Sequence, residues 1–389
     1  MKKCLLLIVC CTFSSLLMAA PDNCIEWLGS SERVIFQPVN GGAWYPRMLK
    51  LQNNRWLCAY DTRQWSETYP HIGISRSKDE GNEWEYAATA SFGMGSAANG
   101  QLMQLPCGDV LCAYRLVLGE TKTLKVSKST DNGWNWTHLS TIISNTGGVW
   151  EPHIIRKDDG QLLVFYAQDE NSGGYDQIIE MQRSDDNGAT WHSPQFVSGA
   201  TWSRDGMPVP EVLDNGDIFV VIEAHFNAGE VFSIASVRST DGGDTWGPRT
   251  LVCDMNDLAA APYVVQAPNG QLIASFQTDD VPEGYVNEMG ITASFDGGRT
   301  WFQQPRPFSA TSGPNFYWNS LMLQDEDTVV AVTSAGNIRM IKGRLKSPYN
   351  IPADLNDDGR VNLRDISELA AYWLFDCWGN TTAPACAFE

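Results

Sequence analysis

The 389-residue sequence lacks the features that mark several large classes of protein. After residue 20 no apolar segment is long enough to cross a bilayer as a helix, and no basic tract offsets a formal net charge of −19. Such a chain is a poor partner for nucleic acid or anionic lipid, whereas a neutral glycan is compatible with it. The five histidines form no triad and no HExxH motif, so the sequence gives no support to Ser-His or metal-dependent hydrolysis.

The cysteines likewise show no CxxC pair, and a zinc signature is therefore absent. Residues 1–20, MKKCLLLIVCCTFSSLLMAA, have two lysines, a short apolar run and small residues, which is the layout of a secretory signal peptide. Its removal would take the charge from −19 to −21 and leave seven cysteines. Cys377 and Cys386 could form a terminal disulfide in an oxidising compartment, and the other five are typical of small core residues. We predict a secreted protein, either periplasmic, extracellular or at the cell surface.

One motif, Ser-x-Asp-x-Gly-x-x-Trp, occurs five times at steps of 52, 55, 55 and 55 residues. An aspartate that accepts backbone N–H bonds, a glycine in a special conformation and a tryptophan packed beneath predict a tight hairpin turn. We therefore assign this motif a structural role and no catalytic one. The copies are SKDEGNEW, STDNGWNW, SDDNGATW, STDGGDTW and SFDGGRTW, which begin at Ser77, Ser129, Ser184, Ser239 and Ser294.

A second repeat, strand–turn–strand, occurs six times between these turns, as in HIIRKDDGQLLVFY and YVVQAPNGQLIASF. Six strand-only units of about 54 residues predict an all-β, six-bladed β-propeller over residues 24–347. The sixth unit has no copy of the turn motif, as expected of a last blade that closes the ring with the N-terminal strand.

The pattern changes in residues 348–389, where DLNDDGRVNLRD has the spacing of an EF-hand-type calcium loop, with Gly359 at the sharp turn. An apolar-periodic helix, LRDISELAAYWLF, follows it. We predict a small α-helical module with one structural Ca²⁺ ion and no cofactor for catalysis. Loop positions one, three, five, seven, nine and twelve are Asp354, Asn356, Asp358, Arg360, Asn362 and Asp365.

Two glutamates interrupt the apolar repeat on adjacent units. Glu151 precedes the first strand of the third unit, and Glu223 ends the second strand of the fourth, after the apolar run from Ile218 to Ile222. Loops of several blades converge at the central channel of a propeller, so we expect the two carboxylates to meet there. Such a pair suits glycoside hydrolysis, with one acid/base and one nucleophile or water-activating base. Each could instead be a satisfied or rim-exposed acid.

Other polar and aromatic residues fall near the same face. Arginine can clamp a hydroxyl or orient a carboxylate, aspartate accepts hydroxyl hydrogen bonds, and tryptophan offers a flat face for a sugar. Each of these could equally be a core residue or a packing ion pair. The candidate substrate-binding residues are Arg47, Asp61, Arg63, Arg115, Trp150, Trp202, Arg204 and Asp205.

The five turns are shared by sialidases and related propellers, so they indicate a fold and no activity. The ordered set GGVWEP, SRDGMP, FVVIEA, APYVVQ…LIASFQTDD and WNSLMLQDEDTVVAV resembles the exo-α-1,5-arabinanases of glycoside hydrolase family 93 over residues 40–345. That resemblance implies catalysis by Glu151 and Glu223, retention of configuration and release of arabinobiose from an arabinan chain end. We assign Glu151 as nucleophile and Glu223 as acid/base, with the reverse order open. The C-terminal segment resembles dockerin modules, although it has one loop where they have two, and it implies a cohesin-like or cell-surface partner.

Two alternatives compete with this hypothesis. A sialidase would need three channel arginines and a tyrosine nucleophile paired with a glutamate. YPRM resembles the first arginine segment and Tyr317 is the candidate nucleophile, but no third arginine is evident. A non-catalytic glycan-binding propeller would need no paired acids.

Overall fold

The computed structural model describes residues 23–63, 68–169, 176–201, 203–226, 230–253, 258–280, 287–308 and 315–346. The predicted signal peptide and the predicted calcium module lie outside these residues. Within them, no helix has the length and apolar character needed to span a membrane.

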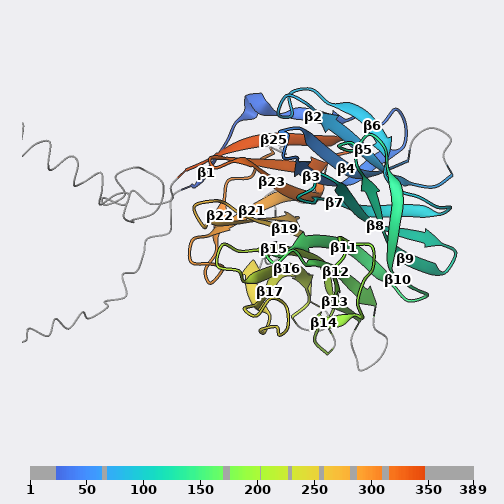
Figure 1. Cartoon of the computed structure of the whole chain (residues 1–389). Coiled ribbons are helices and arrows are strands. Elements are labelled where there is room, and N and C mark those ends of the chain that lie inside the picture. The colour runs from blue at the N-terminus through green and yellow to red at the C-terminus, as the bar shows by residue number, and fades with distance from the viewer. Residues whose placement is uncertain are drawn as a thin grey trace, which may run out of the picture.

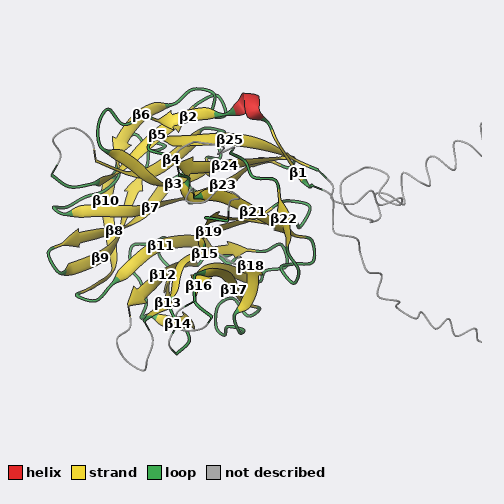
Figure 2. Cartoon of the chain, turned by 180° about the vertical axis from the view of Figure 1, so that it is seen from behind, coloured by secondary structure: helices red, strands yellow, loops and turns green. Residues whose placement is uncertain are grey.

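The described chain is a ring of six antiparallel sheets, so the prediction of a six-bladed β-propeller is confirmed (Figure 1). Figure 2 shows strands joined by loops and turns, with one short 3₁₀ helix among the described residues, η1 (Gly29–Ser31). The first three blades, each given from its innermost strand outward, are β3 (Gly42–Lys50), β4 (Trp56–Arg63), β5 (His71–Ser77) and β6 (Glu85–Thr89); β7 (Ser96–Gln104), β8 (Val110–Leu118), β9 (Thr121–Ser129) and β10 (Thr137–Asn145); and β11 (Val149–Arg156), β12 (Leu162–Asp169), β13 (Gln177–Ser184) and β14 (Gln195–Ser198).

The sixth blade closes the ring in the way that its missing turn motif predicts. Its outermost position is taken by strands from the N-terminal end of the described chain, with Ile25 opposite Leu345 and Arg33 opposite Met340. The last three blades are β15 (Asp205–Val212), β16 (Ile218–Ala224), β17 (Ser233–Ser239) and β18 (Thr250–Cys253); β19 (Ala259–Gln266), β20 (Leu272–Thr278), β21 (Glu288–Ser294) and β22 (Phe302–Gln304); and β23 (Tyr317–Asp325), β24 (Thr328–Ser334) and β25 (Ile338–Leu345), the last paired with β1 (Ile25–Trp27) and β2 (Arg33–Phe36).

The repeated turn has the structure that its sequence predicts. In the second copy, Asp131 accepts the backbone N–H of Asn135 at 2.8 Å, and Ser129 Oγ accepts that of Gly133 at 2.8 Å. Gly133 has φ +87°, a conformation that favours glycine, and Trp136 Nε1 donates to its carbonyl at 3.1 Å. The turn therefore satisfies its own polar groups and fixes the outer part of the five blades that carry it.

The hydrophobic cores lie between adjacent blades. Leu111 and Val126 of blade 2, for example, share one buried cluster with Val149 and Leu162 of blade 3. Because every sheet is covered on both faces, its middle strands are continuous apolar runs, as in IFVVIEA of β16, whose seven residues are all buried. Packing across the blades holds the six innermost strands rigidly around the channel.

Four of the five described cysteines (Cys24, Cys58, Cys112 and Cys253) are buried and unbridged, as predicted for core residues. Cys107 is exposed on the turn between β7 and β8, which corrects that prediction at one position. Its surroundings, Pro106 and Gly108, belong to a turn that places side chains in solvent.

Candidate active site

Each innermost strand carries a β-bulge at the same point. Its ladder with the second strand skips register there, as between Trp150 and His153 in β11. One non-glycine residue in each bulge has a positive φ between 47° and 61°, an uncommon conformation that aims its side chain away from the pleat. These six residues, called the channel ring below, are Tyr45, Asn99, Glu151, Met207, Ala261 and Trp318.

Proline follows the ring residue in four of the six blades. Proline has no N–H to give to a ladder, so within sheets it is confined to edges and bulges. The Trp-Glu-Pro sequence is therefore the third blade's version of a motif that recurs around the channel, and its glutamate is what sets that blade apart. The prolines are Pro46, Pro152, Pro208 and Pro262.

The ring residues converge in the channel. Tyr45, Met207, Ala261 and Trp318, from blades 1, 4, 5 and 6, pack together as one apolar cluster. Tyr45 and Trp318 also line a cavity of about 350 Å³, called the central cavity below, together with Asn99 and Glu151. Its remaining lining residues are Trp44, Asp61, Pro70, Ala97, Ala98, Arg115 and Trp150.

Glu151 is half-buried at the edge of this cavity, and its Oε2 has no hydrogen-bond partner among the described residues. Burial and the negative charge of Glu223 raise the pKa of Glu151 to about 7, although Arg115, Arg204 and the backbone N–H of Met207 act in the opposite direction. Glu151 is thus a carboxyl group that holds its proton near neutral pH and has one buried oxygen without an internal hydrogen bond.

Glu223 lies close enough to Glu151 to affect its pKa, yet its own environment is different. Its Oε2 accepts the backbone N–H of Ala261 at 3.0 Å, and its Oε1 lies 3.7 Å from Arg204 Nη1. Burial raises the pKa of Glu223, while this N–H and Arg204 favour the charged form. Gly206 leaves room for the carboxylate, because a Cβ there would lie 3.1 Å from Glu223 Oε1.

Asp61 is the counterpart of Glu223 in blade 1. In register, Asp61 faces Trp44 as Glu223 faces Gly206, each opposite the residue before the channel ring. Asp61 Oδ2 accepts the backbone N–H of Asn99 at 3.0 Å, which repeats the bond between Glu223 and the next blade. Burial raises the pKa of Asp61 to about 7. The cavity is therefore lined by two carboxyl groups, those of Glu151 and Asp61, while Glu223 is not one of its lining residues.

Arg115 and Trp150 both line the central cavity. Arg115 occupies the equivalent register position in blade 2, opposite Ala98. Its guanidinium carbon lies 4.0 Å from the centre of the Trp150 ring, whose Nε1 donates to Asp169 Oδ1 at 3.0 Å. Stacking fixes the plane of the arginine and leaves it beside Glu151.

Arg47, a predicted substrate-binding residue, is buried and is not one of the residues that line the cavity. Only 1% of the residue is exposed, and its guanidinium carbon lies 3.8 Å from the centre of the Tyr45 ring. Its Nη1 donates to the carbonyls of Pro46 and Trp318, at 2.9 and 3.1 Å. Arg47 thus ties blade 1 to blade 6.

Arg204 and Asp205 are neighbours in sequence but have opposite surroundings. The Arg204 side chain is 39% exposed and lies beside Glu223. Asp205 is fully buried, and it accepts Arg249 Nη1 at 2.7 Å on one oxygen and Ser198 Oγ at 2.6 Å on the other. Its carboxylate faces the interior of blade 4 and anchors the start of β15, so it is not offered to a ligand in this arrangement.

The remaining predicted residues lie away from the cavity or outside the description. Arg63 is exposed at the end of β4 and is not one of the residues that line the cavity. Trp202 lies outside the described residues, as do the calcium-loop residues Asp354, Asn356, Asp358, Arg360, Asn362 and Asp365.

Sequence reasoning missed Trp44, Tyr45, Asn99 and Trp318, all of which line the cavity. The three aromatic residues stand at the start of a strand and look like core residues. The sequence of one unit, taken alone, therefore does not identify them as cavity residues. Alignment of each unit on the residue pair Trp150–Glu151 would have found them, since they fall at the same position in other blades.

The arrangement can carry out acid–base chemistry on a neutral polar molecule. Burial and the charge of Glu223 raise the pKa of Glu151 to about 7, so Glu151 keeps its proton up to near neutral pH. One of the two carboxyl groups can then donate a proton while the other acts as a base or nucleophile. Three tryptophans (Trp44, Trp150 and Trp318) supply flat apolar faces around them.

Comparison with known proteins agrees with this fold. The model of the BNR repeat-like domain matches residues 142–346. A sialidase of Paraclostridium sordellii is 25% identical over 206 residues, which cover 45% of this chain and 48% of that protein. A xyloglucanase of a Paenibacillus species is 25% identical over 181 residues, which cover 45% of this chain and 16% of that protein. The chain thus spans less than half the length of these two relatives.

Two solved structures are similar over most of the chain. An α-L-arabinofuranosidase of Fusarium graminearum, in complex with an iminosugar inhibitor, has a TM-score of 0.68 at 20% identity, over 81% of this chain and 97% of that one. An α-L-arabinanase of Penicillium chrysogenum, complexed with arabinobiose, has a TM-score of 0.69 at 20% identity, over 82% and 98%. At this identity the likeness concerns the fold.

Proposed function

The chain belongs to the BNR repeat-like family, and we propose that it is a secreted, retaining glycoside hydrolase that acts on α-L-arabinofuranosyl chains. The observation that carries this proposal is a pair of carboxyl groups on adjacent blades, half-buried Glu151 in the lining of a tryptophan-lined cavity and buried Glu223 close enough to raise the pKa of Glu151. The fold shared with an arabinanase that binds arabinobiose supports the choice of sugar.

The electrostatics support a division of roles that is the reverse of the assignment made from sequence. Glu223 is held by the N–H of Ala261 and by Arg204, which stabilise its charged form, so we assign it as the nucleophile. Glu151 keeps its proton near pH 7, so we assign it as the acid that protonates the leaving oxygen and later activates water.

In the first step Glu223 attacks the anomeric carbon and a glycosyl ester forms, while the Glu151 proton passes to the departing sugar oxygen. In the second step Glu151 takes a proton from water, which attacks the same carbon and releases the sugar with its configuration retained. Asp61, Arg115 and Asn99 hold the sugar hydroxyl groups from the side of blades 1 and 2. Asp61 Oδ1, Asn99 Oδ1 and Arg115 Nε have no hydrogen-bond partners among the described residues.

The size of the cavity fits attack at a chain end. At about 350 Å³ it lies at the small end of ligand pockets, which suits one or two sugar units. Release of a disaccharide, arabinobiose, is therefore part of the proposal.

A sialidase is the second candidate, and the surroundings of the arginines count against it. Such an enzyme needs arginines that reach the carboxylate of its substrate, but Arg47 is covered by Tyr45 and Arg115 is stacked on Trp150. The hydroxyl of Tyr317 accepts from Asn287 Nδ2 at 3.4 Å, and no glutamate is paired with it among the described residues. A purely glycan-binding propeller would gain nothing from two mutually repelling acids.

Secretion and calcium binding remain proposals from the sequence. The loop from Asp354 to Asp365 is proposed to hold one structural Ca²⁺ ion and to attach the protein to a cohesin-like or cell-surface partner. Calorimetric titration of the full chain with CaCl₂, beside the variant Asp354→Ala/Asp358→Ala, tests the ion. One equivalent of heat in the first protein and none in the variant is expected, and equal heats would contradict the proposal.

The substrate is tested by incubating the protein with linear 1,5-α-L-arabinan and, separately, with sialyllactose. We expect arabinobiose from the first and no sialic acid from the second. Release of sialic acid would replace the arabinanase proposal with the sialidase one.

A further inference from the structure

The central cavity adjoins a second hollow that the proposed chemistry does not use. This hollow, called the side groove below, has a volume of about 290 Å³ and lies where loops of blades 1 and 2 meet. Pro70 and Ala97 line both the central cavity and the side groove. The backbone N–H of Ala97 donates to the Pro70 carbonyl at 3.0 Å, so the shared wall is a fixed part of the fold.

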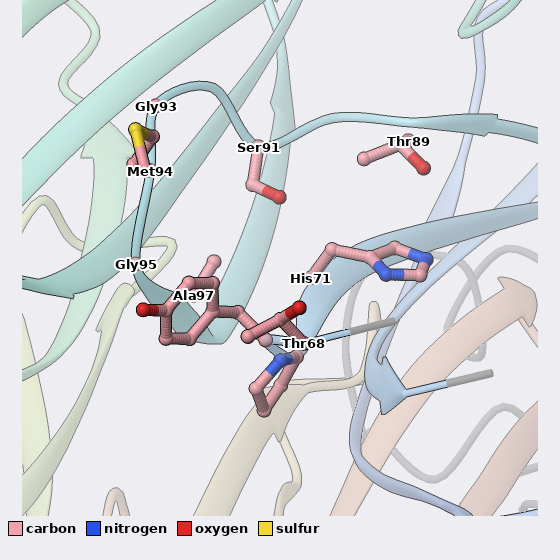
Figure 3. Close-up of a pocket in the computed structure, with 10 residues that line it drawn as sticks. Thr68, His71, Thr89, Ser91, Gly93, Met94, Gly95 and Ala97 are labelled. Carbon is pink, nitrogen blue, oxygen red and sulfur yellow. The ribbon is translucent and has the colours of Figure 1, made fainter. Parts of the chain in front are cut away.

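The side groove has apolar side chains that face solvent. Tyr69 is 43% exposed and Met94 is 75% exposed. Figure 3 shows Met94 on the loop that also carries Ser91 and Gly95, with His71 and Thr89 across the hollow. Exposed apolar side chains that line one hollow are a feature of ligand-binding grooves.

The conformation of the loop that carries Met94 is fixed by two glycines and one hydrogen bond. Gly93 and Gly95 flank Met94 with φ values of +112° and +122°. A Cβ on Gly95 would lie 2.2 Å from the carbonyl oxygen of Val117, so only glycine lets the loop pack this closely on β8. Ser91 fixes the other end, since its Oγ accepts the N–H of Ile72 at 3.0 Å. The exposure of Met94 follows from a rigid loop.

The side groove is suited to a neutral ligand, since His71 is the one titratable side chain of the acidic or basic kind in its lining. The whole chain has a formal charge of −19, yet the ten residues that line the groove include no aspartate, glutamate, lysine or arginine. An aromatic ring, a thioether and hydroxyl side chains are what a neutral sugar uses, with its apolar face on the ring and its hydroxyls on the polar groups.

A third hollow adjoins the side groove on the side away from the central cavity. Gly93 and Met94 also line this further hollow of about 310 Å³ beside Leu118, which is 54% exposed. Each of the three hollows thus shares two lining residues with the next, in a series from the central cavity to the β8–β9 hairpin of blade 2. A polymer whose end lies in the central cavity has to leave by some route, and the route through the side groove and the further hollow has no acidic side chain; its basic side chains are His71 in the side groove and Lys125 in the further hollow.

We infer that the side groove binds the sugar units of the neutral polysaccharide chain that extend beyond the central cavity. The inference rests on the proposed function, because the occupant is the same substrate chain. It adds a role for Tyr69 and Met94, which lie outside the catalytic machinery. The groove makes the enzyme prefer long chains to short ones.

The test measures kcat/KM for linear α-1,5-arabino-oligosaccharides from three to six units. For the unaltered protein we expect a rise with length of about tenfold, which corresponds to about 1.4 kcal/mol. In Tyr69→Ala/Met94→Ala the trisaccharide value should stay the same and the rise with length should disappear. The control Phe196→Ala removes a side chain that is 54% exposed on β14, and it should keep the rise. Absence of the rise in the unaltered protein, or its persistence in the double variant, would overturn the inference.

A second readout separates this inference from the proposed function. If no arabino-oligosaccharide is cleaved, the proposed function fails, and the groove is judged by electrophoresis in gels that contain linear arabinan or xyloglucan. Retardation of the unaltered protein by either polymer, reduced in Tyr69→Ala/Met94→Ala and kept in Phe196→Ala, would support the groove. No retardation by either polymer, or equal retardation of all three proteins, would overturn it.

Discussion

The carboxylate of Glu223 accepts the backbone N–H of Ala261 at 3.0 Å, and Ala261 holds the same place in blade 5 that Glu151 holds in blade 3. The bond joins the second strand of one blade to the bulge of the next. Asp61 and Asn99 repeat it between blades 1 and 2. The fold thus offers an acceptor position at the end of the second strand and a side-chain position at each bulge. Acid–base chemistry becomes possible where one acidic residue occupies the bulge position of a blade and another occupies the acceptor position of the neighbouring blade.

The pH dependence of activity should identify which glutamate carries the proton. With Glu151 protonated and Glu223 ionised in the active form, kcat/KM falls above about pH 7 as Glu151 loses its proton. The acid limb comes from Glu223, whose pKa burial raises above its ordinary value. An aryl arabinobioside with a 2,4-dinitrophenyl leaving group needs little protonation, so Glu151→Gln should cleave it without the alkaline limb. If Glu223→Gln is the variant that behaves in this way, the roles are reversed.

The same carboxyl group should make stability depend on pH. The pKa of Glu151 is about 7 in the folded protein against 4.5 for an ordinary glutamate, so the folded state binds its proton more tightly. The stability that this proton contributes is fully present below about pH 4.5 and is lost as the pH rises through 7. Glu151→Gln should therefore raise the free energy of unfolding by roughly 1–3 kcal/mol at pH 8 and change it little at pH 4.5.

Urea unfolding of Glu151→Gln at the two pH values measures this difference. Glu83→Gln, a substitution at an exposed position, is the matched control. A variant that is no more stable than the unaltered protein at pH 8 would show that Glu151 is not under electrostatic strain.

Asp205 and Arg249 should prove essential to blade 4 without touching the substrate. Removing Arg249 leaves the fully buried Asp205 carboxylate without its cation, which costs about 3–5 kcal/mol. We expect Arg249→Ala to lower the melting temperature strongly in a thermal scan. Arg339→Ala, which breaks a partly exposed ion pair with Glu32, should change it little.

Activity separates this anchoring role from substrate binding. If Asp205 only anchors β15, Asp205→Asn should lose stability and kcat, while KM for arabinan oligosaccharides stays within about twofold. A large rise in KM with unchanged stability would mean instead that the Asp205 carboxylate contacts the sugar.

The sequence predicts the fold well because its periodic signals act locally. Each turn motif closes its own hairpin, and each apolar run needs only a neighbouring blade of the same kind. Glu151 and Glu223 were found as candidates because they break that repeat. The surroundings of Arg47 and Asp205 were not foreseen, since they depend on contacts between distant segments: Arg47 with the carbonyl of Trp318, and Asp205 with Arg249. Nothing in either local sequence separates a buried ion from one that faces the channel.

The aromatic side of the cavity was missed for a related reason. Tyr45 and Trp318 resemble core residues in sequence, and Tyr45 does pack in the apolar cluster of the channel. Their contact with the cavity comes from the bulge, which turns the side chain by a positive φ. The pattern of apolar residues along one strand does not reveal the extra residue of a bulge. Comparison of the six repeat units at the bulge position does reveal it.

The central claim is that Glu151 and Glu223 act as one catalytic pair. ¹H NMR of a linear 1,5-α-L-arabinan digest, followed from the first minutes, tests it most directly, with Glu151→Gln and Glu223→Gln beside the unaltered protein. The account predicts that the α-anomer of the released sugar appears first and that each substitution lowers the rate by a factor of about 10³ or more. First appearance of the β-anomer, or arabinan cleavage that both variants leave undiminished, would contradict it.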